Sequence, residues 1–167
     1  PNGGSVTLSM LPIFVFCIRW GFGPGLLVSF AFGLLQLFLD VAYSAGWQSI
    51  IGDYLLAFTV PGLAGLVARR RSGVFTGTLI AGFARFLVHY VVGATIWAEY
   101  MPETFFGLTM HSPWFYSLLY NLAYMLPNIA ITLVVFAIGI LITLVYVVVI
   151  SSWGQLEAAT VIGNYVA

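Results

Sequence analysis

The stretch "ARFLVHYVVGATIWAEY", residues 84–100, decides the predicted fold, because it is apolar enough to cross a membrane yet carries regularly spaced polar side chains. Arg85, His89, Gly93 and Trp97 are four residues apart, a spacing that places them on one slowly turning face of a helix. Charged groups at membrane depth normally face a polar cavity. The stripe therefore predicts a membrane helix with one face lining such a cavity.

The composition of the whole chain supports a membrane protein. Of its 167 residues, 62% are hydrophobic and 6% are charged, whereas a soluble domain has about 25% charged residues. The absence of lysine and a net charge of zero exclude a nucleic-acid partner. The single Cys17 excludes an internal disulfide and a cysteine-based metal cluster, and we expect it to be an inert core residue.

Long apolar segments organise the chain, and a membrane span needs roughly 20 residues. They cover residues 5–18, 22–39, 50–67, 73–97 and 115–150, with a weaker one at 155–167. Pro127 predicts a break in the last long segment, giving a tilted helix and a half-helix. We predict a transmembrane substrate-binding bundle over residues 1–150 and a separate terminal segment over 151–167. Because Pro1 opens the chain without a signal peptide, we expect that the natural start is not included.

The charges of the loops predict the orientation. Arg69–Arg71 is the one basic cluster, so its loop is expected on the cytoplasmic side. Alternation of the spans then places the loops at 40–49 and 98–114 outside, and these loops carry acidic residues and no basic ones.

Ionisable residues inside the spans are costly, on the order of 2.5–3.5 kcal/mol each. Asp53 and Arg85 are the charged residues among them. They either form an ion pair that only stabilises the fold, as structural glue, or they bind a ligand. In the predicted topology Asp53, His89 and Asn121 converge on the outer half of the membrane. A carboxylate among aromatic rings suits a flat, cationic, partly apolar small molecule, since aromatic faces and carboxylates both attract cations.

Several enzyme classes lack their motifs. His89 and His111 belong to no HExxH pattern, and the chain has no GxSxG elbow and no P-loop. A small intramembrane serine hydrolase that uses Ser44 or Ser117 with His89 stays open as an alternative. An ion-conducting protein is a second one.

Four stretches together resemble the thiamine-specific S-component of energy-coupling-factor (ECF) vitamin transporters. They are "PNGGSVTLSMLPI" (1–13), "GWQSIIGDYLLAFTVPGLAGLV" (46–67), "RFLVHYVVGATIWAEY" (85–100) and "FYSLLYN" (115–121). The resemblance covers roughly residues 1–145. It implies an all-α integral membrane protein with a six-helix bundle, of which about five spans are clear in this chain. It also implies capture of thiamine from outside with high affinity, and delivery through a transmembrane coupling protein with two ATPases.

The same resemblance implies which residues contact the ligand. The matching positions are Tyr43, Asp53, Tyr54, His89, Gly93, Trp97, Tyr116 and Asn121. Gly93 would let the flat ligand approach the helix backbone, and Trp97 would stack on a ring. Asp53 stands where the family has a glutamate, and Arg85 stands where it has a lysine. No catalytic residue, metal or cofactor other than the ligand is implied.

Both ends of the chain depart from the family pattern. Gly3 and Gly4 occupy the place of a first-loop tryptophan found in some members, and the family's first helix is absent before residue 1. Near the C-terminus, Ala159, Gly163 and Ala167 form a small-xxx-small stripe, which lets helices pack closely in lipid. This tail is either the first helix displaced, docking on the coupling protein, or an unrelated terminal segment.

The sequence therefore predicts a multi-pass protein of the bacterial plasma membrane that binds thiamine from the outside. A sibling S-component for another flat heteroaromatic, such as the pyrimidine precursor of thiamine, is the nearest alternative.

Overall fold

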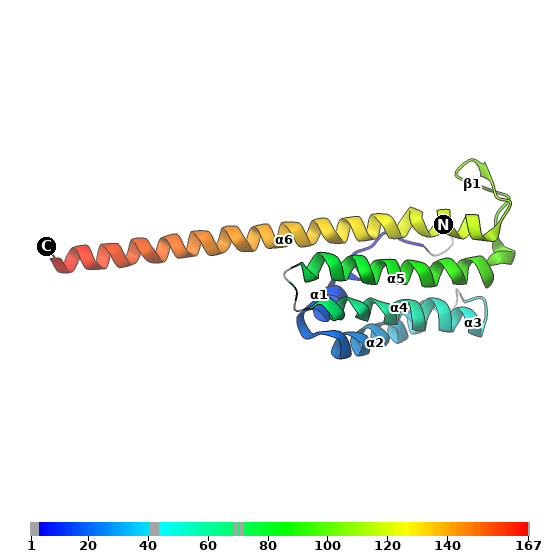
Figure 1. Cartoon of the computed structure of the whole chain (residues 1–167), viewed down its shortest axis with the longest axis horizontal. Coiled ribbons are helices and arrows are strands. Elements are labelled where there is room, and N and C mark those ends of the chain that lie inside the picture. The colour runs from blue at the N-terminus through cyan, green and yellow to red at the C-terminus, as the bar shows by residue number, and fades with distance from the viewer. Residues whose placement is uncertain (1–3, 41–43, 69, 71, 167) are drawn as a thin grey trace. The chain divides into compact units, whose positions relative to one another are not determined.

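The computed structural model describes residues 4–40, 44–68, 70 and 72–166, the last ten mostly by their backbone (Figure 1). The described residues form helices and one short hairpin. They divide into two compact units, Pro1–Leu133 and Val134–Ala167. The first unit contains every predicted ligand-contacting residue.

The first two helices are joined by a tight turn. α1 (Leu11–Trp20) has a proline in its first turn and ends at Gly21, whose φ of 89° favours glycine. α2 (Phe22–Asp40) follows at once. The apolar segment at 5–18 suggested a helix from residue 5 onward, but the helix begins only at Leu11 and residues 4–10 are not helical.

The next span changes its helical winding three times. It consists of α3 (Trp47–Ser49), the π-helix η2 (Ile50–Leu56), α4 (Ala57–Thr59) and the 3₁₀-helix η3 (Val60–Val67). Pro61 lies in η3 and has no N–H to donate to an α-helical ladder. π-Helical turns frequently occur at functional sites, and Asp53 lies within η2.

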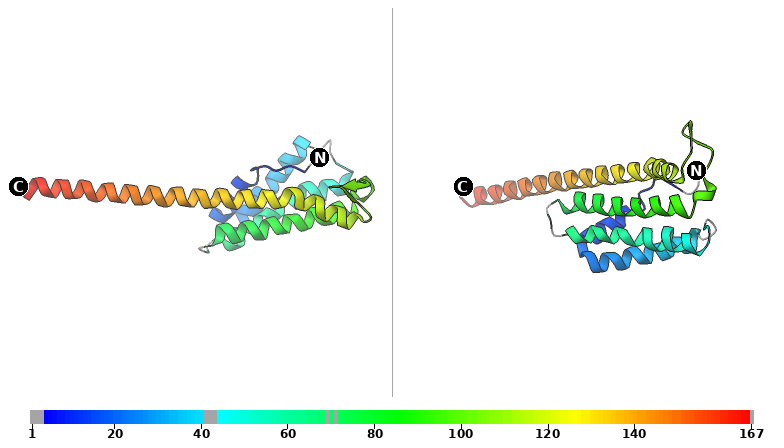
Figure 2. Two further views of the ribbon diagram at one scale, coloured as in Figure 1. Left: turned by 90° about the horizontal axis from the view of Figure 1, so that it is seen from above. Right: turned by 45° about the vertical axis from the view of Figure 1, so that its right-hand side comes forward.

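α5 (Gly73–Thr95) carries the polar stripe and lies between α6 and the η2–η3 span (Figures 1 and 2). After the short 3₁₀-helix η4 (Ala98–Tyr100), the outer loop forms a hairpin of β1 (Thr104–Phe105) and β2 (Leu108–Thr109). Phe106 and Gly107 both have positive φ at its turn, as a type I′ turn requires.

α6 (Pro113–Val166) runs through Pro127 and belongs to both units. The predicted break at Pro127 is wrong, and residues 155–166 continue the same helix. Membrane helices tolerate proline because neighbouring groups can satisfy the carbonyl that it leaves free. The split between the units comes after Leu133, ahead of the boundary that the sequence suggested at residue 150.

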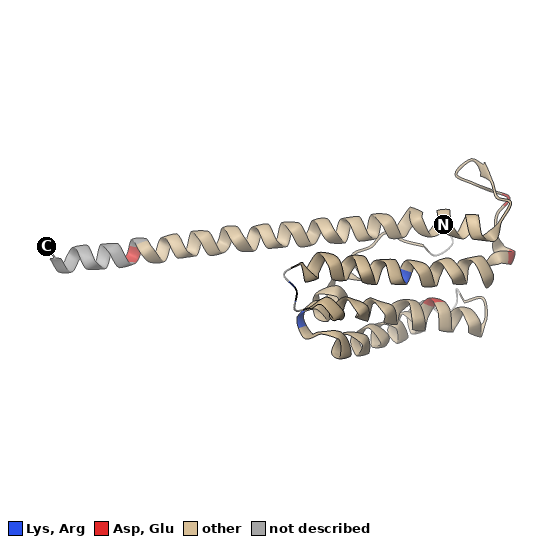
Figure 3. Cartoon of the chain, viewed as in Figure 1, with Lys and Arg blue, Asp and Glu red and all other residues tan. Residues whose placement is uncertain are grey.

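Small residues fill the contacts between helices, while large apolar ones face outward. Cys17, Ala57, Ala64 and Ala81 are fully buried, whereas Phe38 is 80% exposed. Small residues allow close helix packing in lipid. Cys17 lies 3.7 Å from the Ser29 hydroxyl, in the core as expected. In the part of the chain that the structure describes, four helices are long and apolar enough to span a membrane, and few charged positions interrupt them (Figure 3).

Candidate functional site

A cavity of about 820 Å³ opens between α5, the first part of α6, the η2 span and the N-terminal segment. The predicted residues that line it are Asp53, Tyr54, Arg85, His89, Gly93, Trp97, Tyr116 and Asn121. Tyr43 lies outside the described residues. The structure therefore gathers eight of the nine predicted ligand contacts around one space.

Asp53 holds two side chains of the α5 stripe. Its Oδ1 accepts a hydrogen bond from Nδ1 of His89 at 2.9 Å, and its Oδ2 accepts from the indole Nε1 of Trp97 at 2.7 Å. The side chains of Asp53 and His89 are 18% and 13% exposed. Residues 89 and 97 are two helical turns apart on α5, so one carboxylate fixes the orientation of both rings.

Arg85 is not the ion-pair partner of Asp53. Among the described residues, the close contact of the Asp53 carboxylate is with the imidazole of His89, and no salt bridge joins it to Arg85. The guanidinium of Arg85 instead lies over the ring of Phe58, with Cζ 4.3 Å from the ring centroid. Such cation–π contacts contribute about 0.5–2 kcal/mol. Asp53 and Arg85 are thus held by different partners, and the glue hypothesis fails for this pair.

Two buried side-chain nitrogens at the cavity have no hydrogen-bond partner in the described part of the chain. They are Nε of Arg85 and Nε2 of His89. The Arg85 atom is a donor. Because Nδ1 of a neutral His89 donates to Asp53, its Nε2 is an acceptor. Buried polar atoms are rarely left unsatisfied, so an occupant that offers one acceptor and one donor would fit this space.

Gly93 makes room for α6. A Cβ at this position would collide with the Ser117 hydroxyl and lie 3.5 Å from Nδ2 of Asn121. The hydroxyl of Ser117 donates to the Tyr90 carbonyl at 2.8 Å. The glycine therefore has a packing role that the sequence did not predict, and its contact with a ligand stays a prediction.

Asn121 ties α6 to the stripe. Its amide nitrogen donates to the carbonyl of His89 at 3.3 Å and to the carbonyl of Ser117 at 2.8 Å. Its Oδ1 accepts from the Tyr124 hydroxyl at 2.7 Å. Asn121 is thus 2% exposed and fully engaged, which suits it to holding the wall of the cavity in shape.

Four further polar residues of α6 line the cavity and were missed in the sequence. Tyr120, Tyr124, Asn128 and Thr132 continue from Tyr116 at intervals of four residues. The ring centroids of Tyr116 and Tyr120 are 5.7 Å apart, and those of Tyr120 and Tyr124 are 5.4 Å apart. The same four-residue spacing that revealed the α5 stripe would have found this one.

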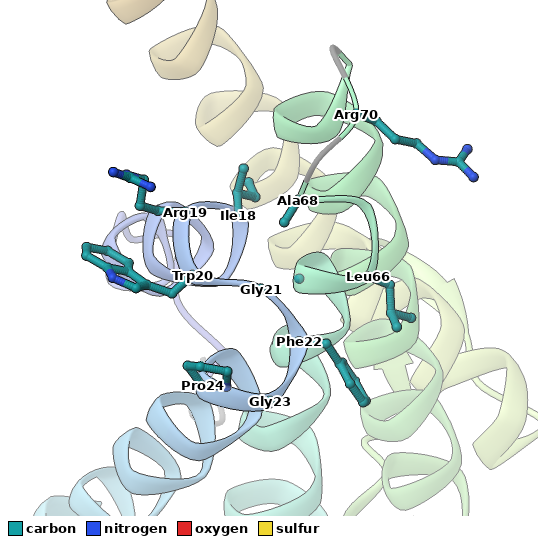
Figure 4. Close-up of a pocket in the computed structure, with 11 residues that line it drawn as sticks. Ile18, Arg19, Trp20, Gly21, Phe22, Gly23, Pro24, Leu66, Ala68 and Arg70 are labelled. Atoms are coloured by element: carbon teal, nitrogen blue, oxygen red, sulfur yellow. The ribbon is translucent and has the colours of Figure 1, made fainter.

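A second pocket, of about 930 Å³, lies where the α1–α2 turn meets the end of η3 (Figure 4). Arg19 and Arg70 line it, but their side chains point away from each other. The Arg19 guanidinium lies 5.6 Å from the Trp20 ring centroid. The charges of this pocket do not converge, and none of the predicted ligand contacts lies there.

The sequence matches a known family of membrane transporters. The family described as "Thiamine transporter protein (Thia_YuaJ)" matches residues 1–149. The chain belongs to this family. It is therefore a multi-pass membrane component of thiamine uptake, and a transport protein instead of an enzyme, so the hydrolase alternative with Ser44 or Ser117 is set aside.

Individual relatives agree with this thiamine transporter family. The chain is 30% identical to the thiamine transporter ThiT of Bacillus subtilis over 152 residues, covering 81% of this chain and 74% of that one. It is also 30% identical to ThiT of Lacticaseibacillus paracasei over 153 residues, covering 80% and 71%. The resemblance to thiamine-specific S-components is confirmed.

The fold also matches a solved structure. ThiT from Listeria monocytogenes superposes with a TM-score of 0.70 at 24% identity, covering 81% of this chain and 78% of that one. This likeness confirms the all-α membrane fold predicted from the sequence.

Proposed function

We propose that this chain captures thiamine from outside the cell with high affinity, in the cavity that Asp53, His89 and Trp97 border. The two unpartnered nitrogens carry this proposal. The aminopyrimidine of thiamine has an exocyclic amino group that can donate to Nε2 of His89, and ring nitrogens that can accept from Nε of Arg85. One flat ligand could thus satisfy both buried atoms.

The cationic ring of thiamine supplies the second part of the argument. Asp53 is the one carboxylate among the described residues that line the cavity. Trp97 has its indole N–H committed to that carboxylate, so its ring is held in a fixed plane beside the charge. A fixed aromatic face next to a carboxylate suits a thiazolium, which gains from stacking and from charge neutralisation.

The lining of the cavity reaches Trp97 and Tyr100, at the end of α5 that the charges assign to the outside. The stripe of α5 climbs from Arg85 to Trp97 and ends at the loop that holds Glu99 and Glu103. In the sequence, Arg69–Arg71 comes shortly before Gly73, where the opposite end of the same helix begins. By the positive-inside rule the arginine end is cytoplasmic, in a bacterial plasma membrane.

Transport across the membrane needs an energy source that this chain does not encode. Its sequence has no P-loop, so we propose that an ECF coupling protein with two ATPases drives delivery into the cell. Docking through Ala159, Gly163 and Ala167 remains a prediction, because their side chains lie outside the described residues. The lipid bilayer is the other partner.

Titration of the detergent-solubilised protein with thiamine tests this function. Binding beside Trp97 should quench the intrinsic tryptophan fluorescence, with a dissociation constant in the nanomolar range, about −12 kcal/mol. The pyrimidine precursor should bind more weakly, since it lacks the thiazolium. Equal affinity for the precursor would favour the sibling function, and no response to either compound would refute the proposal.

A further inference from the structure

The N-terminal segment Gly4–Ser9 lies along α6 and forms one wall of the cavity (Figures 1 and 2). Gly4, Ser5, Thr7 and Ser9 all line the space. The segment is not helical, and Ser5 to Ser9 are exposed. A short, exposed segment thus separates the cavity from its surroundings.

Hydrogen bonds from α6 hold this segment. The backbone N–H of Thr7 donates to Oδ1 of Asn128 at 2.7 Å, and Nδ2 of Asn128 donates to the carbonyl of Ser5 at 2.8 Å. The hydroxyl of Tyr120 accepts from the N–H of Gly4 at 2.7 Å. These three bonds join residues 4–7 to α6.

The amide of Asn128 is chemically matched to this task. It offers one acceptor and one donor in a plane, as a peptide group does. The carbonyl of Ser5 and the N–H of Thr7 flank Val6 and face the same partner, as they would on a paired strand. Aspartate has the same shape but no donor, so it could keep the bond to Thr7 and would lose the bond to Ser5.

Close packing supports the same attachment. A Cβ at Gly4 would lie 2.7 Å from a ring carbon of Tyr124 and 2.8 Å from the Tyr120 hydroxyl. The segment is therefore pressed against the tyrosines of α6, and Asn128 lies one helical turn beyond Tyr124.

We propose that Asn128 is a positioning residue that clamps Ser5–Thr7 to α6 and thereby sets the rate at which a bound ligand leaves the cavity. This inference rests on the proposed function for the identity of the ligand. The clamp consists of two hydrogen bonds at a half-buried site, so it can open without disturbing the packed helices behind it.

The test compares Asn128→Asp and Tyr120→Phe with the wild type and with a control, Thr143→Val. The control removes a hydroxyl that donates to the Gly139 carbonyl of the same helix, outside the cavity. Stopped-flow tryptophan fluorescence gives the association and dissociation rates of thiamine. Amide exchange, followed by mass spectrometry on the whole protein, reports the opening of residues 4–9.

We expect Asn128→Asp to raise the thiamine dissociation rate about tenfold, equivalent to about 1.4 kcal/mol, and to change the association rate little. Exchange in residues 4–9 should become faster. Tyr120→Phe, which adds no charge to the span, should show the same pattern more weakly, with an unchanged melting temperature without ligand. Unchanged dissociation rates in both variants would overturn the inference, as would a fall in the melting temperature of Tyr120→Phe that matches its loss of affinity. If the wild type binds no thiamine, the proposed function fails, and exchange that stays unchanged in Asn128→Asp would then refute the clamp separately.

Discussion

Replacing Asp53 with asparagine separates recognition of the ligand's charge from alignment of the site. The carboxylate accepts one hydrogen bond from His89 and one from Trp97. Asparagine can accept through its oxygen, but its NH₂ group would face the second donor. The variant therefore loses the negative charge and one hydrogen bond, while it keeps the size of the side chain.

Two opposing effects act on the free energy of unfolding of the unliganded protein. A hydrogen bond to a charged group contributes about 1.5–3 kcal/mol, and asparagine loses one of them. Removing a charge from the membrane recovers a cost on the order of 2.5–3.5 kcal/mol. Because the two effects nearly cancel, we expect only a small change in the melting temperature of Asp53→Asn without ligand.

The affinity for thiamine should respond strongly. Truncating one partner of a buried charge pair costs roughly 2–5 kcal/mol. At 1.4 kcal/mol per factor of ten, the dissociation constant should rise by roughly 30-fold to several thousand-fold. Tryptophan fluorescence titration measures it, and Asp53→Glu, which keeps the charge, should bind much more tightly than Asp53→Asn.

A neutral analogue, in which an uncharged ring replaces the thiazolium, distinguishes the two roles of Asp53. If the carboxylate recognises the cation, Asp53→Asn should weaken thiamine far more than the analogue. Equal weakening of both ligands would refute charge recognition and leave Asp53 as a residue that only aligns His89 and Trp97.

Three further outcomes follow from the described contacts. Trp97→Ala should weaken thiamine about tenfold or more in the same titration, because ring stacking contributes roughly 1–3 kcal/mol; an unchanged affinity would make Trp97 an interfacial residue only. A cysteine placed in the loop at 98–112 should react with an impermeant thiol reagent on whole cells, and one beside Arg70 should not; reversed labelling would put the cavity on the cytoplasmic side. Gly93→Ala should lower the melting temperature, and Ser117→Ala added to it should restore part of the loss, since the Ser117 hydroxyl is the atom that a new Cβ would meet; no rescue would mean that the α5–α6 contact does not account for the glycine.

The α5 stripe could be predicted from sequence because its signal is local. Four-residue spacing alone places Arg85, His89 and Trp97 on one face. Which residue contacts these side chains depends on tertiary structure, and the sequence left two possible partners for Asp53, Arg85 or a ligand. The structure assigns it to His89 and Trp97, across separations of 36 and 44 residues that no periodicity reports.

The features that sequence patterns missed depend on contacts or on unusual helical winding. The π-helical turn around Asp53 has no residue signature comparable to a cap or a proline. The role of Asn128 depends on bonds to residues more than 120 positions away. Pro127, in contrast, led to the prediction of a break that is not there. The rule that proline breaks helices comes from soluble proteins, whereas in a membrane helix neighbouring groups can satisfy the carbonyl that proline leaves free.

The polar groups within the spans are arranged so that an occupant completes them. Asp53 has two donors and Arg85 has the Phe58 ring, but Nε2 of His89 and Nε of Arg85 lack partners in the described residues. An unsatisfied buried polar atom costs about 1–3 kcal/mol, and the folded protein bears this cost as long as the cavity holds no matching ligand. A ligand that satisfies both atoms removes this cost. A ligand that binds only the folded state adds RT ln(1 + [L]/Kd) to the free energy of unfolding, about 4 kcal/mol at a ligand concentration of a thousand times Kd. The same two atoms therefore link recognition to stability: a ligand that binds without engaging them should have a higher dissociation constant, and at equal free concentration it should stabilise the protein less than thiamine does.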